Sequence, residues 1–165
     1  MGCPGCALEL ERQPGLPAPK FHSSPECWSL YGELVATFTL VSRDPGFPHQ
    51  HVVDAYTAQH IGPEMKPIGA VFALVGLCLT LERGATGRQV QLAHMDLGKT
   101  KRNWPAMQPT THRFDVTVQD VLRQATPEEK RARIRDWMRC TWDAWGHEHE
   151  RIREILKAVV LRPTP

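Results

Sequence analysis

Apolar residues recur at helical spacing along most of the chain after residue 24, and no segment shows the sustained strict alternation of a half-buried strand. Ser24 and Pro25, followed by Glu26, predict where the first helix begins. Its predicted inward positions are Cys27, Leu30, Tyr31, Leu34, Phe38 and Val41. A segment rich in Pro and Gly, Asp44 to Pro48, is expected to end this helix.

Two further helices are predicted in the middle of the chain. The second helix runs from His49 to His60, and its inward face carries His49, Val52, Val53, Tyr56 and His60. The third, Ile68 to Arg83, is apolar nearly all round, which predicts a central position, and Gly84 is its expected end. Its most apolar stretch, Ile68 to Leu81, is too short to span a bilayer.

The C-terminal half begins with a predicted amphipathic helix, Thr86 to Gly98, and a long loop, Lys99 to Arg113. A short helix is predicted from Val116 to Gln124. The signature Thr126-Pro127-Glu128-Glu129 then opens a long final helix, whose apolar seam runs from Ile134 to Val159 and is interrupted by His149.

The expected fold class is therefore all-α. It is a helical bundle of about four main helices plus short helices, with an N-terminal zinc-binding knuckle. The domain prediction has two parts, a CxxC knuckle and loop at residues 1–24 and a single bundle domain at residues 25–165.

Charge and cysteine content narrow the range of functions. With 20 basic and 18 acidic residues among 165, the net charge is +2, and no Lys/Arg block alternates with aromatic residues. Nucleic acid and anionic membranes are therefore not expected partners. The five cysteines are odd in number and no signal peptide precedes Cys3, which predicts reduced thiols and a cytoplasmic location.

The N-terminal cysteines point to a metal site. Cys3 and Cys6 flank a Pro-Gly turn, and Cys27 stands at the start of the first helix. If the first two helices form an antiparallel hairpin, His60 lies level with Cys27, and these four residues make a Cys₃His zinc site. His22 and His49 are the alternative fourth ligands. A further alternative is an unligated N-terminus with Cys27 as a core thiol.

A second group of polar residues interrupts the apolar seams. His49 and His149 face inward on separate helices, and Asp54, Glu82 and Tyr56 are candidates to join them in a second metal site or an acid/base pair. The alternative is structural: core histidines that are hydrogen-bonded, Glu82 paired with a nearby cation, and Asp54 solvated. Trp137, Trp142 and Trp145 are interpreted as packing residues.

Five strings occur in order along most of the chain: CPGC, SSPECWSLYGEL, HQHVVDAYTAQH, GLCLTLERG and WDAWGHEHERIR. Together they resemble a family of small bacterial proteins catalogued only as a domain of unknown function. The resemblance implies that its recurrent motif positions here are Cys3, Cys6, Cys27, His49, Asp54, His60, Glu82, Trp145 and His149. The family tends to carry two adjacent histidines near the C-terminal Trp, whereas this chain has Glu148-His149. A looser similarity, of fold alone, is to DinB-like metal-dependent bundles.

Three classes of function follow from these patterns. The first is a cytoplasmic zinc protein whose site is mainly structural, because four protein ligands leave no position for activated water. The second is a small enzyme using His49, Asp54, Glu82 and His149 on a small-molecule substrate. The third is a non-catalytic partner or binding module.

Overall fold

The computed structural model describes residues 2–40 and 49–164, and over these residues its regular elements are helical apart from one isolated bridge between Gly2 and Glu9. The helices are α1 (Pro25–Leu34), α2 (His49–Gln59), α3 (Pro67–Arg83), α4 (Gly87–Gly98), α5 (Val118–Leu122), α6 (Pro127–Ala144) and α7 (His149–Ile155). A π-helical turn, Val35–Thr39, extends α1. The all-α prediction is confirmed. Val41 and the predicted break from Asp44 to Pro48 lie outside the described residues.

Local capping chemistry explains where several helices begin and end. The Ser24 side chain accepts a hydrogen bond from the Cys27 backbone N–H at the start of α1. Reciprocal capping boxes open α4, with Thr86 and Gln89, and α6, with Thr126 and Glu129. Gly84 ends α3 in the left-handed region at φ +66°, as glycine readily does.

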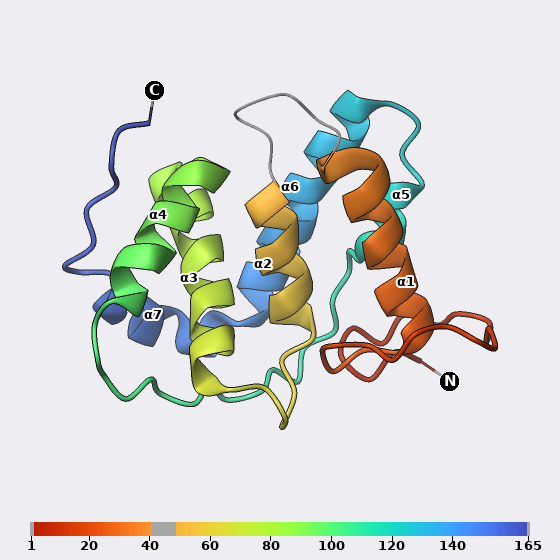
Figure 1. Cartoon of the computed structure of the whole chain (residues 1–165), viewed down its shortest axis with the longest axis horizontal. Helices are drawn as coiled ribbons and strands as arrows, with labels where there is room; N and C mark the ends of the chain where they lie inside the picture. Colours follow the sequence, from red (N-terminus) through yellow and green to blue (C-terminus); the bar gives the residue numbers. More distant parts are fainter. Residues whose placement is uncertain (1, 41–48, 165) are drawn as a thin grey trace.

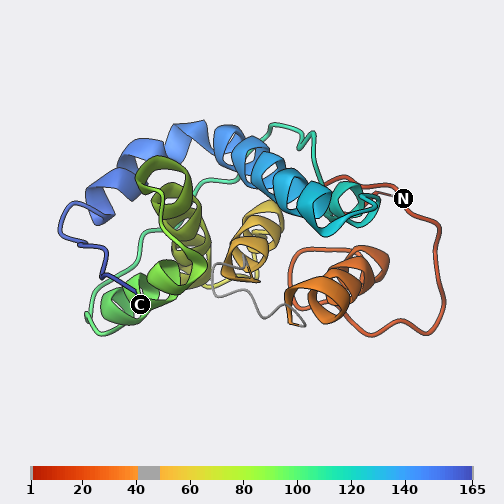
Figure 2. The same cartoon turned by 90° about the horizontal axis from the view of Figure 1, so that it is seen from above.

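The helices pack in a bundle in which α2 is central. α2 and α3 run side by side in opposite directions, with α4 beside α3 and α1 on the other side of α2 (Figure 1). The long α6 lies across the bundle and packs against α2, α3 and α5 (Figure 2). The largest fully buried side chains are Trp137, Trp145, Tyr56, Leu34, Leu74, Leu77, Leu79, Ile134, Met138, Ile152, Leu156 and His60.

The prediction of one continuous final helix is wrong. α6 ends at Ala144, and a 3-10 turn, Gly146–Glu148, redirects the chain into α7. The buried Trp145 indole donates to the Ala58 carbonyl at 3.0 Å, which fixes the chain at this point, and Gly146 is a poor helix former. After the turn, α7 packs against α3 and buries Ile152 there.

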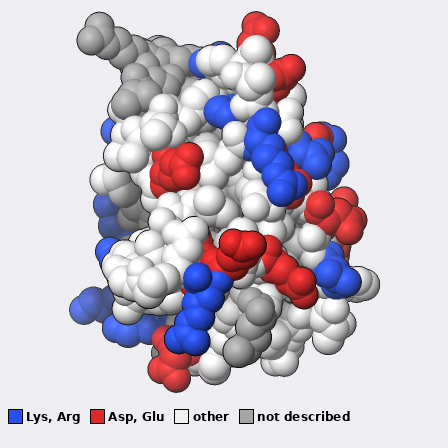
Figure 3. All heavy atoms as spheres, turned by 90° about the vertical axis from the view of Figure 1, so that its right-hand side faces the viewer, with Lys and Arg blue, Asp and Glu red and all other residues white. Residues whose placement is uncertain are grey.

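The surface seen in Figure 3 carries acidic and basic side chains interspersed among uncharged ones. Within residues 2–40 and 49–164, none of the helices combines the length and apolar character needed to cross a membrane.

Candidate metal centre

Four side chains from distant parts of the sequence meet beside the start of α1 and the end of α2. They are Cys3, Cys6, Cys27 and His60, and their ligand atoms all lie within 4.8 Å of one another. Cys27 and His60 are 0% exposed, and Cys3 and Cys6 are each 3% exposed. The predicted group is confirmed as one that could hold a metal ion.

The N-terminal turn brings Cys3 and Cys6 to the same side. The Cys3 N–H donates to the Leu8 carbonyl and the Ala7 N–H donates to the Cys3 carbonyl, both at 2.8 Å. Ala7 adopts φ +61°, a strained value for a residue with a Cβ, at the residue after Cys6. The Ser24 N–H donates to the Cys3 Sγ at 3.4 Å, which joins this turn to the start of α1.

Glycine at position 5 allows the turn to approach α2. A Cβ atom on Gly5 would lie 2.5 Å from the His22 carbonyl oxygen and 2.6 Å from Cδ2 of His60. The turn therefore packs directly on the ligand ring, and a larger residue at this position would push the two apart.

The other two ligands come from helices that run in opposite directions (Figure 1). Cys27 lies in the first turn of α1, and His60 directly follows the last residue of α2. The Cys27 Sγ lies 3.5 Å from Nε2 of His60 and 3.8 Å from Sγ of Cys6. The antiparallel arrangement predicted for these two helices thus explains why His60 rather than a nearer histidine joins the group.

Neither alternative histidine belongs to this group among the described residues. The His22 side chain lies against Gly62, where an added Cβ would be 2.3 Å from the His22 Cβ. His49, at the far end of α2, makes a 2.8 Å hydrogen bond between its Nδ1 and the Thr39 hydroxyl.

The outer contacts of His60 fix its orientation. Its Nδ1 lies 2.7 Å from the Tyr56 carbonyl oxygen, so the Nδ1–H donates there and Nε2 faces the thiols. A ligating histidine usually has a partner of this kind on its second nitrogen. The Tyr56 ring stacks on the His60 ring with centroids 4.0 Å apart, and its hydroxyl donates to the Cys27 Sγ at 3.7 Å.

Tyr56 was assigned by the sequence pattern to the second polar group, but the structure places it beside the metal cluster. Its ring also stacks on that of Tyr31 at 4.2 Å, which joins α1 to α2. The signal that could have revealed this position is the spacing of four residues between Tyr56 and His60, which places both on one helix face.

The three thiols have strongly different proton affinities because they share one buried site. Hydrogen bonds from Cys27 and Cys6 lower the pKa of Cys3. Hydrogen bonds to Cys3 and Cys6, together with burial, raise the pKa of Cys27. The hydrogen bond between Cys6 and Cys27 lowers the pKa of Cys6, but the hydrogen bond with Cys3 and burial outweigh it and raise this pKa to about 12. Once one of these thiols is ionised, its negative charge therefore opposes the ionisation of a second thiol.

The four catalytic candidates have different partners in the structure. His49 and Asp54 are on α2, where Asp54 is 2% exposed and accepts a 2.9 Å hydrogen bond from Gln50. Burial lowers the pKa of His49 and raises the pKa of Asp54 well above its usual value. In the part of the chain that the structure describes, no hydrogen bond, ion pair or ring contact joins these two residues to Glu82 or His149.

Glu82 and His149 share a partner, Trp142. The Trp142 indole N–H donates to Glu82 at 3.2 Å, and the His149 ring stacks on the Trp142 ring with centroids 3.7 Å apart. Glu82 forms its ion pair with Arg153 of α7 at 2.7 Å, not with the adjacent Arg83. The hydrogen bonds from Arg153 lower the pKa of Glu82, and the positive charge of Arg153 makes a smaller contribution in the same direction. A catalytic role for these residues stays a prediction.

Comparison with known proteins identifies one relationship. The family described as a family of unknown function, DUF5946, matches residues 1–146. The match includes all four residues of the metal cluster and stops before α7. The curated proteins and the solved structures gave no significant match.

Proposed function

Because the chain belongs to DUF5946, a family of unknown function, we propose its role from its own geometry: a zinc-binding protein whose Cys₃His site is mainly structural. Cys3, Cys6, Cys27 and His60 are the proposed ligands. The site would fasten the N-terminal segment to the start of α1 and the end of α2, three parts of the chain that are distant in sequence.

One observation carries this proposal, the agreement between the ligand spacing and a zinc tetrahedron. With Zn–S bonds of about 2.3 Å and a Zn–N bond of about 2.0–2.1 Å, tetrahedral geometry places two sulfurs about 3.8 Å apart and a sulfur and nitrogen about 3.6 Å apart. The separations here are 3.8 Å for Cys6 to Cys27 and 3.5 Å for Cys27 to His60. Two edges of the tetrahedron therefore have the expected lengths.

The chemistry of the donors supports the same metal. Thiolates and an imidazole in tetrahedral arrangement favour zinc or iron over magnesium or calcium, which prefer oxygen ligands. A divalent cation would also stabilise the ionised thiols and so oppose the hydrogen bonds, burial and like charge that raise the pKa values of Cys6 and Cys27. All three sulfurs could then be ionised together.

A structural role is favoured over catalysis at this metal. All four donors come from the protein and all are buried, which leaves no open position for water or substrate. The five cysteines are free thiols, which fits a reducing compartment. A cytoplasmic location is therefore part of the proposal. The bacterial origin implied by the family resemblance, and a role without nucleic-acid or membrane partners, are also part of it.

Metal analysis of the purified full chain tests the proposal. We expect about one equivalent of zinc, and loss of most of it in Cys27→Ala. Cys78→Ala is the matched control, because Cys78 is also a buried thiol but its Sγ donates to Glu82 outside the metal group. Cobalt substitution adds a spectroscopic readout, since three thiolate ligands give intense charge-transfer absorption in a tetrahedral site.

Two results would refute the assignment. One is less than about half an equivalent of zinc in wild-type protein, unchanged by Cys27→Ala. The other is bound iron with visible absorption in protein purified without added metal, which would assign the cluster to a different metal.

A further inference from the structure

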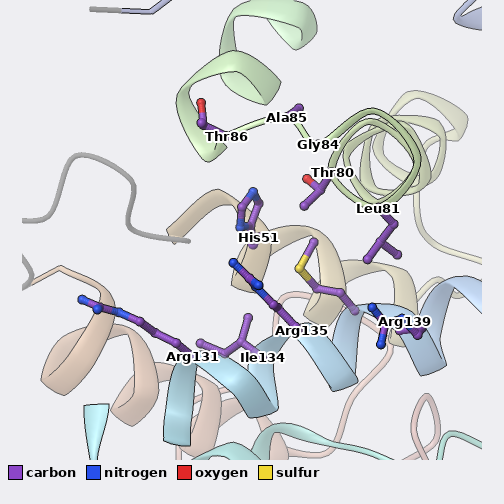
Figure 4. Close-up of a pocket in the computed structure, with 11 residues that line it drawn as sticks. His51, Thr80, Leu81, Gly84, Ala85, Thr86, Arg131, Ile134, Arg135 and Arg139 are labelled. Atoms are coloured by element: carbon purple, nitrogen blue, oxygen red, sulfur yellow. The ribbon is translucent and has the colours of Figure 1, made fainter. Parts of the chain in front are cut away.

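A second site lies at the opposite end of α2 from His60. Helices α2, α3 and α6, together with the turn that leads into α4, enclose a pocket of about 580 Å³ (Figure 4). Its volume falls in the range of small-molecule sites. His51 contributes from α2, nine residues before His60, or about 14 Å along a helix. The pocket is therefore distinct from the metal cluster.

Three arginines line one wall of the pocket. Arg131, Arg135 and Arg139 of α6 are spaced four residues apart, which places them on one face of the helix. They extend over about 12 Å along the axis. None of the described lining residues is Asp or Glu, and neither Arg135 nor Arg139 forms an ion pair within residues 2–40 and 49–164. This wall has an excess of positive charge.

The pocket also contains buried polar atoms that lack partners among the described residues. These atoms are Nε2 of His51 and Oγ1 of Thr80. Buried polar atoms are usually hydrogen-bonded, so two unpartnered atoms on residues that line a pocket favour a polar ligand, which these side chains would turn to meet. Figure 4 shows the Arg135 side chain extending from α6 toward His51 of α2.

The remaining walls add two properties. The turn Gly84 to Thr86 leads into α4, a helix of 12 residues whose N-terminal end carries a partial positive charge. Leu81, Ile134 and Met138 supply apolar surface beside the arginines. A ligand suited to this pocket therefore has an anionic end and a less polar body.

We propose that this pocket binds a phosphorylated small molecule. Guanidinium groups bind phosphate oxygens through paired hydrogen bonds, and the row of arginines is longer than one carboxylate requires. The phosphate contacts Arg135 and Arg139, the Thr80 hydroxyl and His51 supply further hydrogen bonds, and the body of the ligand rests on the apolar wall. This assignment does not depend on the zinc site.

Calorimetric titration of the full, metal-loaded chain tests the assignment with five probes: pyrophosphate, AMP, adenosine, citrate and a single-stranded oligonucleotide. Pyrophosphate and AMP are expected to bind, whereas adenosine, which has the same base and sugar as AMP without the phosphate, is not. Citrate tests whether carboxylates are preferred. Arg135→Gln and Arg139→Gln are each expected to weaken pyrophosphate binding at least about tenfold, because each removes a charge-assisted bidentate contact.

Arg123→Gln is the matched control, since Arg123 is an exposed arginine at the end of α5 and does not line the pocket. It is expected to leave pyrophosphate affinity unchanged. Because Arg135 and Arg139 are exposed, their variants should fold, and unchanged zinc content and melting temperature verify this.

Several outcomes would overturn the proposal. One is absence of binding by both pyrophosphate and AMP at about 1 mM, an affinity weaker than expected for a built site. Others are equal affinity for AMP and adenosine, tighter binding of citrate than of pyrophosphate, or unchanged affinity in the double variant Arg135→Gln/Arg139→Gln. A single-stranded oligonucleotide that binds more tightly than AMP would assign the arginines to a nucleic-acid surface instead.

Discussion

The Oδ2 atom of Asp54 lies so close to Gly76 that a Cβ atom added to this glycine would stand 1.9 Å from it. Asp54 is on α2 and Gly76 is in the middle of α3, so the buried carboxyl group packs directly on the backbone of the neighbouring helix. Oδ1 is bonded to Gln50, whereas Oδ2 is buried and has no partner among the described residues. The close contact between α2 and α3 therefore depends on the absence of a side chain at position 76.

Gly76→Ala is expected to lower the free energy of unfolding by about 2–3 kcal/mol, because the Cβ would overlap a short side chain that has little room to move. Urea denaturation measures this. Gly32→Ala is the control: Gly32 is in α1 with nothing within 4 Å of an added Cβ, and it should gain up to about 1 kcal/mol from helix propensity.

A double variant, Asp54→Ala/Gly76→Ala, tests whether the loss of stability in Gly76→Ala comes from overlap of the added Cβ with the Asp54 carboxyl group. If the Asp54 carboxyl is the obstacle, the double variant is more stable than Gly76→Ala alone. Simple additivity of the two single changes would contradict the packing described here.

The buried Asp54 makes stability depend on pH. Burial raises the pKa of Asp54 well above its usual value, so the folded chain holds this proton more tightly than the unfolded chain does. Its contribution is fully present below the unfolded pKa of about 3.9 and is lost as pH rises toward the folded pKa. Asp54→Asn should therefore gain stability relative to wild type as pH increases, measured by urea denaturation at a series of pH values. A constant difference across that series would contradict the buried-acid assignment.

His51 is expected to give stability the opposite dependence on pH from that of Asp54. Burial, with a smaller contribution from the Arg135 charge, lowers the pKa of His51 to about 4, although the hydrogen bond to the Ala85 backbone acts in the opposite direction. Its contribution is present above the unfolded pKa of about 6.5 and is lost as pH falls toward 4, up to about 3 kcal/mol. NMR titration of the imidazole measures this pKa directly, and a value near 6.5 would disprove the prediction. His51→Gln should reduce the loss of stability between these two pH values.

Gly5→Ala is expected to weaken metal binding without removing a ligand. The added Cβ would lie 2.6 Å from Cδ2 of His60, so the turn holding Cys3 and Cys6 must move away from the ring. We expect at least about a tenfold loss of zinc affinity, measured by competition with a chromogenic chelator. Gly146→Ala, where an added Cβ meets nothing within 4 Å, should retain wild-type affinity.

Removal of the metal should loosen one end of the molecule. Residues 2–24 contain no helix and carry two of the four proposed ligands, whereas α3 and α6 belong to the apolar core. Chelation should lower the melting temperature by about 10 °C, equivalent to about 3 kcal/mol. Hydrogen exchange should show lost protection in residues 2–24 and at the end of α2, with α3 and α6 still protected. Uniform loss across all helices would instead indicate that the metal supports the whole fold.

Much of the fold could be predicted from local chemistry. The spacing of apolar residues predicted the helices, and the start signals at Ser24 and Thr126 placed the starts of α1 and α6 correctly. The break between α6 and α7 could not be predicted in this way, because apolar spacing continues through Gly146. It is set by the long-range bond from the Trp145 indole to Ala58 and by the packing of α7 on α3.

The metal cluster could be predicted because helical phase and an antiparallel connection limit which residues can meet. That reasoning brought Cys27 and His60 together over 33 residues of sequence. It did not identify the contacts of Tyr56 with Cys27 and Tyr31 of α1, nor the pocket lined by His51 and Arg135, since these depend on how separate helices pack. The division of the chain at residue 24 into two parts stays a prediction.

The sequence by itself thus determined the residue types able to bind a metal, the helical class and most helix boundaries, because these depend on interactions within a few residues. Only the tertiary structure decided where the last helix breaks, that Tyr56 packs beside the metal cluster, and which side chains share a pocket. Those outcomes depend on close packing between separate helices, and a contact such as the Trp145 indole with the Ala58 carbonyl joins residues that are far apart in the sequence.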